Sequence, residues 1–196
     1  MIKSHSRKLG RKLYIVYPGE YIAVKEDCVM ASITGATVAV CLYDLERTIG
    51  GMGHFIVPGT IGTRGLIADD IARHGIQSME LLMGEIVKKG GDRKYLKAKL
   101  FGAGYIEKSI SGMGGVQDSN IKFLHEYFAL EKIDIVKEDL GGDYRRKIYF
   151  YPLKGKVLRR FQKRNEDSSE FKVLEKEYID CVFRDRERTG KLILFE

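Results

Sequence analysis

The residues of this chain best suited to acid–base chemistry are its 4 histidines, and His54 has the most unusual surroundings. It follows the run Gly-Gly-Met-Gly at residues 50–53, inside a segment with the composition of a strand. Glycine weakens a strand and is often kept where a bulge forms or another part of the chain approaches closely. We therefore expect His54 to lie beside a cleft as a candidate acid–base residue; the alternative is a histidine hydrogen-bonded within a sheet. His5, His74 and His125 are expected to be structural or exposed to solvent.

The 3 cysteines are the candidate thiol nucleophiles or metal ligands. Cys28, Cys41 and Cys181 are odd in number, and no two of them have the Cys-x-x-Cys spacing. This pattern argues against both a disulfide framework and a zinc site. We expect three reduced thiols that pack as small hydrophobic side chains.

A glycine-rich turn at residues 102–104, Gly-Ala-Gly, follows a predicted strand. Neither a Walker lysine nor a Rossmann acidic residue stands at the required distance, so the turn gives little support for nucleotide binding.

The formal net charge of +7 comes from clusters at residues 145–147 and 154–164. Alternation over residues 145–161 predicts basic side chains on the solvent-facing side of strands. Such a face suits acidic partners. Nucleic acid is not expected as a partner, because no nucleic-acid motif accompanies the charge.

The elements that must position these residues are read from periodicity and turn signals. The run at residues 37–44 is nearly all apolar or β-branched, as in a strand buried on both faces. Helices are expected at 76–89, from Asp118 or Ser119 to 128, and from about 167–170 onward. Further strands are expected at 12–17, 21–24, 28–33, 49–58, 95–101, 133–136 and in a hairpin at 146–161.

This order indicates an α+β fold, a mixed β-sheet sandwich flanked by helices. A chain of 196 residues fits one domain, and its 44% hydrophobic content can build a core. We expect residues 1–165 to form that domain and residues 166–196 to pack on it as a tail, a helix and a short apolar strand. No apolar run reaches the ~18 residues that cross a bilayer. No signal-type segment follows the basic N-terminus, so a cytoplasmic protein without membrane insertion is expected.

Several segments resemble the CheD family of chemotaxis proteins. Residues 35–44, Gly-Ala-Thr-Val-Ala-Val-Cys-Leu-Tyr-Asp, resemble its signature Gly-Ser-Cys-Val-Ala-Val-Cys-Leu-Tyr-Asp. Residues 51–58, Gly-Met-Gly-His-Phe-Ile-Val-Pro, are similar to its histidine motif. Similar blocks follow in the same order at residues 98–102, 138–142, 146–150, 155–157 and 177–195.

This resemblance implies a layered fold of the cysteine-hydrolase type and a protein-glutamine deamidase. In the family a thiolate attacks a glutamine side-chain amide of a chemoreceptor cytoplasmic helix, and a histidine acts as base and then acid. Ammonia leaves and water resolves the thioester to glutamate. A hydroxyl residue a few positions before the cysteine is the third catalytic member. The resemblance implies no metal or organic cofactor, and it implies a CheC-type phosphatase as a further partner.

This chain departs from the family pattern at two of three catalytic positions. His54 matches the family histidine, but Thr37 stands at the position of the cysteine and Ala31 at that of the threonine. A hydroxyl ionises far less readily than a thiol, whose pKa is ~8.5, so His54 would have to remove the Thr37 proton during attack. Without a hydroxyl at Ala31 the imidazole is expected to be less well oriented, unless Ser32 or Thr34 replaces it.

Three readings therefore stay open. The chain is an active deamidase that uses Thr37 and His54, or a catalytically silent binding module for chemoreceptors or a CheC-type phosphatase, or an active enzyme deliberately silenced at Thr37. Cys41 is not expected to replace the nucleophile, since it lies about 13 Å further along an extended strand. If the resemblance holds, Thr37 and His54 lie on neighbouring strands beside one cleft, near residues 102–104.

Overall fold

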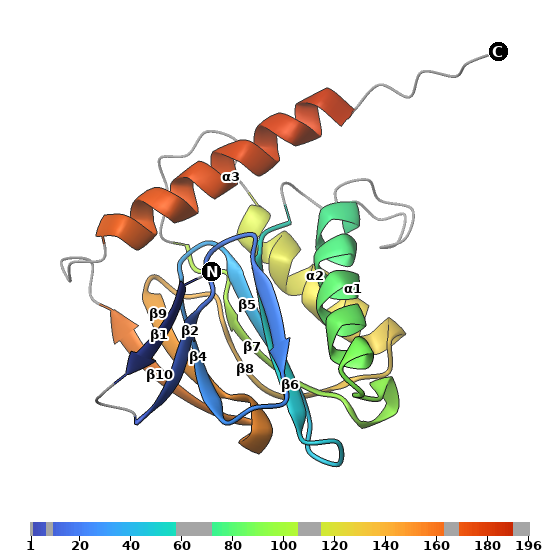
Figure 1. The fold of residues 1–196 in the computed structure, drawn as a ribbon. Helices are drawn as coiled ribbons and strands as arrows, with labels where there is room; N and C mark the ends of the chain where they lie inside the picture. The colour runs from blue at the N-terminus through green and yellow to red at the C-terminus, as the bar shows by residue number, and fades with distance from the viewer. Residues whose placement is uncertain (1, 7–9, 58–71, 106–114, 163–168, 190–196) are drawn as a thin grey trace.

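The structure, a computed structural model, describes residues 2–6, 10–57, 72–105, 115–162 and 169–189 (Figure 1). Its helices are α1 (Ala72–Lys88), α2 (Val116–Leu130) and α3 (Ser169–Thr189). Its strands are β1 (Ile2–Ser6), β2 (Arg11–Ile15), β3 (Tyr21–Val24), β4 (Cys28–Thr34), β5 (Val38–Asp44), β6 (Ile49–Phe55), β7 (Lys97–Gly102), β8 (Asp134–Leu140), β9 (Arg145–Tyr151) and β10 (Lys156–Gln162). Short 3-10 turns at Arg93–Tyr95 and Pro152–Lys154 lead into β7 and β10.

The strands form two five-stranded sheets, in the orders β1-β2-β4-β9-β10 and β3-β6-β5-β7-β8. Both sheets are mixed, because β2 pairs with β4 and β7 with β8 in parallel while the other neighbours are antiparallel. Side chains of the two sheets share one apolar cluster, and α1 and α2 pack on the other face of the second sheet. The expected α+β sandwich flanked by helices is confirmed.

Strand β5 is central to both layers of the core, and every residue in it is buried. Val38, Val40 and Leu42 join the cluster with α1 and α2, whereas Ala39, Cys41 and Tyr43 join the cluster between the sheets. Successive side chains of a strand point to opposite faces, so a strand covered on both sides reads as a continuous apolar run. The prediction of a strand buried on both faces is confirmed.

The glycines of β6 lie where other parts of the chain approach closely, which is one of the two roles expected of glycine inside a strand. A Cβ atom on Gly51 would lie 2.6 Å from the Ile22 carbonyl oxygen and 2.9 Å from Leu82 of α1. A Cβ on Gly50 would lie 2.8 Å from Pro152. Glycine is needed here because strand β3, helix α1 and the Pro152 turn all approach this backbone.

The basic hairpin β9–β10 is solvent-facing only in part, so that expectation is wrong for its first two residues. Arg145 and Arg146 are 6% and 0% exposed. Arg146 donates to Asp139 at 2.9 Å and to the Gly141 carbonyl at 2.6 Å, which compensates for its burial. Arg146 has the strand parity of Ile148 and Phe150, which lie between the two sheets, and Arg145 is ion-paired with Glu175 of α3. Lys156, Arg159 and Arg160 of β10 are exposed; residues 163 and 164 lie outside the described part of the chain.

Helix α3 confirms the expected start of a helix in the tail, whereas the apolar stretch at residues 192–195 lies outside the described residues. Figure 1 shows α3 crossing one end of the two sheets. Its Ile179 and Val182 belong to a small apolar cluster, which also contains Ala36, Ile56 and Val116. Among the described helices, none is both long and apolar enough to cross a membrane.

Candidate active site

Thr37 and His54 come together at the end of the sandwich that α3 covers. Thr37 ends the connection between β4 and β5, and His54 lies in β6 opposite Ala39 of β5. The Thr37 Oγ1 and His54 Nε2 atoms are 2.6 Å apart. The predicted neighbourhood of the two residues is confirmed, but the described part of the chain covers both side chains and does not leave them beside a cleft: Thr37 is 0% exposed and His54 1%.

The Gly-Ala-Gly turn after β7 holds the loop that carries Thr37. The Ala103 N–H donates to the Thr37 carbonyl at 3.0 Å, and the Gly104 N–H donates to the Gly35 carbonyl at 2.8 Å. Gly102 has φ +116°, and a Cβ there would lie 2.2 Å from the Thr37 carbonyl oxygen. Only glycine tolerates both conditions, so this turn supports Thr37 at close range.

The second imidazole nitrogen of His54 faces a serine that replaces the hydroxyl expected to be missing. His54 Nδ1 is 2.8 Å from Ser32 Oγ, and Ser32 Oγ is 2.7 Å from the Val16 carbonyl oxygen. Ser32 has the same strand parity as Met30, which points into the space between the sheets, whereas Ala31 has the opposite parity. Of the two expected outcomes, a poorly oriented imidazole or a replacement hydroxyl from Ser32 or Thr34, the structure therefore supports replacement by Ser32.

Burial lowers the pKa of His54 to about 4, although the negative charge of Glu175 and the Val16 carbonyl act in the opposite direction. The imidazole is therefore neutral at neutral pH. A neutral imidazole can accept a proton, which is what a general base must do.

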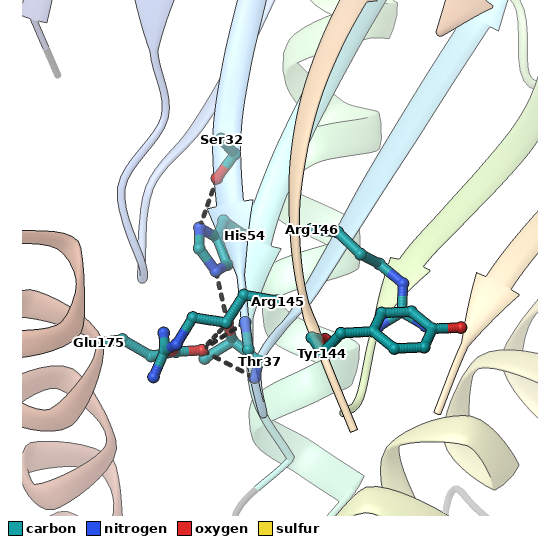
Figure 2. A network of polar contacts seen from close by, with 8 residues as sticks. Ser32, Thr37, His54, Tyr144, Arg145, Arg146 and Glu175 are labelled. Carbon is teal, nitrogen blue, oxygen red and sulfur yellow. Dashed lines mark hydrogen bonds and ion pairs between the residues drawn. The ribbon is translucent and has the colours of Figure 1, made fainter. Parts of the chain in front are cut away.

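Glu175 of α3 is the site residue that sequence reasoning missed (Figure 2). Its Oε1 accepts hydrogen bonds from the Gly35 N–H at 2.9 Å, the Thr37 N–H at 3.2 Å and the Thr37 hydroxyl at 2.7 Å. Its Oε2 is ion-paired with Arg145, and the carboxylate is 2% exposed. A Cβ on Gly35 would lie 2.6 Å from Glu175 Oε2, so a larger residue at position 35 would force the carboxylate to shift from this position.

Burial alone would raise the pKa of Glu175, but the Arg145 charge and the bonds from Thr37 outweigh it, and the pKa is lowered. The carboxylate is therefore charged while α3 is in place.

One signal in the sequence could have identified Glu175 as a candidate site residue. Glu175 lies at helical spacing with Tyr178, Ile179 and Val182, so it is an acidic residue within an apolar helix face.

The hydrogen bonds of this network assign the protons in two alternative ways. With the Glu175 carboxylate present, the single Thr37 hydroxyl proton goes to Oε1 and is not directed to His54 Nε2, while the Ser32 hydroxyl donates to the Val16 carbonyl. Without the carboxylate, Thr37 can donate to Nε2, while Nδ1 donates to Ser32 and Ser32 to Val16. Only the second arrangement leaves the imidazole able to take a proton from Thr37.

The cysteines do not reach this network. Burial raises the pKa of Cys28 to about 12 and raises that of Cys41 as well, so neither forms a thiolate readily. Cys41 lies opposite Met52 in the β5–β6 pairing, away from His54. Cys181 is exposed on α3, which corrects the expectation that all three thiols are packed inside.

The arrangement has the parts needed for acyl transfer to or from an amide. A hydroxyl and an imidazole are within hydrogen-bond reach, and a second hydroxyl orients the imidazole. The N–H groups of Gly35 and Thr37 converge on one oxygen, as donors do when they stabilise a tetrahedral oxyanion.

Known proteins with similar sequences give the family. Residues 58–161 match the family model described as "CheD chemotactic sensory transduction". A "Probable chemoreceptor glutamine deamidase CheD" of Paraburkholderia xenovorans is 39% identical over 155 residues, 79% of this chain and 60% of the relative. A protein of Shewanella oneidensis with the same description, numbered 1, is 36% identical over 78% of this chain and 74% of its own length. One of Laribacter hongkongensis is 36% identical over 73% and 69%, respectively. This chain thus spans about 60% of the Paraburkholderia protein and about 70% of the other two, and it belongs to the CheD family.

Proposed function

We propose that this chain is a chemotaxis protein that acts on glutamine side chains of chemoreceptor cytoplasmic helices. The observation that carries the proposal is the contact series Thr37, His54 and Ser32, with distances of 2.6 and 2.8 Å. In this proposal Thr37 is the nucleophile, His54 is the base and Ser32 is the hydroxyl that orients the imidazole. Membership in a family whose relatives are described as chemoreceptor glutamine deamidases supplies the substrate class. We place its action in the cytoplasm, where those receptor helices lie.

In the proposed reaction His54 takes the proton of Thr37 as the hydroxyl oxygen attacks the amide carbon of the glutamine side chain. The Gly35 and Thr37 N–H groups stabilise the oxyanion. His54 returns the proton to the leaving ammonia, and water then hydrolyses the ester to glutamate. No metal or organic cofactor takes part in these steps.

The nucleophile sets the rate. A threonine hydroxyl within the chain lacks the N-terminal amine that assists known threonine nucleophiles, and its β-methyl group restricts its rotamers. We therefore expect slow deamidation by the chain as it stands. This supports a second candidate function, a receptor-binding module that retains the recognition surface with little turnover.

The deciding experiment is incubation with glutamine-bearing receptor cytoplasmic fragments, followed by mass spectrometry for amide-to-acid conversion. Thr37→Cys should convert receptor glutamines at least about a hundredfold faster than the unaltered chain. Thr37→Cys with His54→Ala should be inactive while still folded, and alkylation of the Thr37→Cys protein should abolish turnover. Robust conversion by the unaltered chain, lost in Thr37→Ala, would establish a hydroxyl nucleophile and exclude the silent module.

If the Thr37→Cys protein binds receptor fragments but converts none of them, the binding module is the correct function. If it neither binds nor converts them, the substrate proposal is wrong.

A CheC-type phosphatase is the second proposed partner, and the exposed basic residues of β10 are proposed to steer acidic partners toward the chain. Charge reversal at Lys156, Arg159 and Arg160 should weaken receptor or phosphatase binding, more strongly at low salt. Unchanged affinity at every salt concentration would reduce this basic strand to an ordinary solvated face.

A further inference from the structure

Helix α3 places a carboxylate where the side chain of a substrate glutamine would have to lie. For Thr37 to attack an amide, the carbonyl oxygen of that amide must lie on the Gly35 and Thr37 N–H groups. Glu175 Oε1 occupies that position and also accepts the Thr37 hydroxyl at 2.7 Å. A glutamate side chain is also what remains when a glutamine side-chain amide has been hydrolysed. Glu175 is therefore in the position of the reaction product.

The surface beneath α3 is also matched to a helix. Tyr178, three residues after Glu175, lies so close to Gly19 that a Cβ there would be 2.8 Å from its ring. Ile179 and Val182 lie four and seven residues after Glu175 and are buried. They pack in one apolar cluster with Ala36 of the β4–β5 connection, Ile56 after β6 and Val116 of α2. These contacts extend over two turns of one helical face.

We propose that α3 occupies the substrate surface of this chain as a bound product would, and that a receptor helix must replace it. The replacing helix presents a glutamine followed by apolar side chains four and seven positions later, as α3 presents Glu175, Ile179 and Val182. This inference rests on the proposed function, and it adds both a recognition pattern for the receptor and an internal competitor.

The charges explain why the competitor is a glutamate. Arg145 is 6% exposed and ion-paired with Glu175, so a carboxylate gains a charge-assisted contact that an amide does not. While Glu175 is docked, it also accepts the hydrogen bond of the Thr37 hydroxyl, so that proton is not directed to His54. The apparent affinity for receptor is lowered in proportion to the fraction of molecules in which α3 is displaced.

A direct test converts α3 into a substrate in the full chain. Thr37→Cys with Glu175→Gln supplies a thiol nucleophile and a side-chain amide at position 175. His54 takes the thiol proton, the sulfur forms a bond to the amide carbon, the C–N bond breaks, and ammonia leaves with the proton returned by His54. Water then adds to the thioester and the C–S bond breaks, which restores the thiol and leaves a carboxylate. Peptide mass spectrometry reads the conversion at position 175.

The matched control is Thr37→Cys with Glu177→Gln, because Glu177 is exposed on the same helix two residues away. We expect conversion at position 175 at a rate independent of protein concentration, at least about tenfold faster than at position 177. Adding His54→Ala should abolish it. Conversion of receptor glutamines without faster conversion at position 175 would overturn the inference and leave the proposed function intact.

A second measurement decides the inference when the Thr37→Cys protein converts nothing. Backbone hydrogen exchange of residues 173–184 is followed in the unaltered chain, with and without a receptor cytoplasmic fragment at saturating concentration. Displacement of α3 should speed that exchange by at least about tenfold. Receptor binding with unchanged exchange would refute the competition, and absence of receptor binding would remove the proposed function together with this inference.

A matched pair of variants measures the competition itself. Glu175→Ala should tighten receptor binding at least about tenfold, because the docked state loses its carboxylate, whereas Glu177→Ala should leave the affinity unchanged. Equal or weaker receptor binding by Glu175→Ala would contradict the proposal.

Discussion

Lowering the pH from 8 to 5 should destabilise this protein through one side chain, His54. The imidazole is 1% exposed, and its pKa is lowered from 6.5 to about 4 by burial. The unfolded chain therefore binds a proton on this residue as the pH falls through 6.5, while the folded chain stays neutral there down to about pH 4. Because the unfolded state binds more protons in this range, the free energy of unfolding falls as the pH is lowered.

The size of this effect follows from the two pKa values. At pH 5, protonation of an imidazole of pKa 6.5 stabilises the unfolded state by about 2 kcal/mol, while a folded-state pKa of about 4 contributes about 0.1 kcal/mol. We therefore expect the His54 contribution to the free energy of unfolding to be about 2 kcal/mol lower at pH 5 than at pH 8. Glu175 has a lowered pKa, so the stability that it contributes is lost mainly at still lower pH, below that window.

The assay is urea unfolding at pH 8, 6.5 and 5, for the unaltered chain and for His54→Gln. The difference between the two proteins isolates this imidazole, and His125→Gln, which removes an exposed imidazole of α2, should retain the fall. A His54 resonance that titrates near pH 6.5 in the folded protein would refute the buried neutral imidazole. So would an equal pH dependence in the unaltered chain and His54→Gln.

Two further substitution pairs test the support of the site. Gly102→Ala should lower the free energy of unfolding by about 2–4 kcal/mol, because its Cβ would meet the Thr37 carbonyl at 2.2 Å with φ at +116°. Gly84→Ala in α1 has no atom within 4 Å of the new Cβ and should be neutral or stabilising by up to about 1 kcal/mol; equal losses in both variants would contradict the steric argument. In the Thr37→Cys background, Ser32→Ala should lower kcat about tenfold and shift the pH–rate profile, with rescue by Ser32→Thr, because the serine orients the imidazole. Ala31→Thr should give no gain, and a gain from it would show that Ser32 has been assigned the wrong role.

Local patterns in the sequence were sufficient for the framework of the fold, and the resemblance of two short motifs to the CheD family gave two residues of the site. The apolar run of β5 predicted a strand covered on both faces, the spacing of apolar residues predicted α1, and the polar residues at 167–170 predicted the start of α3. Thr37 was singled out by the resemblance of residues 35–44 to the CheD signature, and His54 by the glycines before it and the resemblance of residues 51–58 to the histidine motif; the structure places the two side chains 2.6 Å apart. Signals of this kind depend on neighbours in the chain, and a single sequence contains them.

The rest of the site was decided by tertiary structure. Whether Ala31 or Ser32 faces His54 depends on strand parity, and a shift of one residue exchanges the two faces. Glycines 50, 51 and 53 indicated a bulge or a close approach of another part of the chain, but only the fold shows that α1, β3 and the Pro152 turn pack against them.

Glu175 lies 138 residues after Thr37, and neither its contact with the Thr37 hydroxyl nor its ion pair with Arg145 has a local signature. The acidic residue on an apolar helix face could have been noticed. Its partners, the Thr37 hydroxyl and Arg145, are determined only when α3 packs across the end of the sheets. Such long-range contacts depend on the whole fold and not on the sequence of one segment.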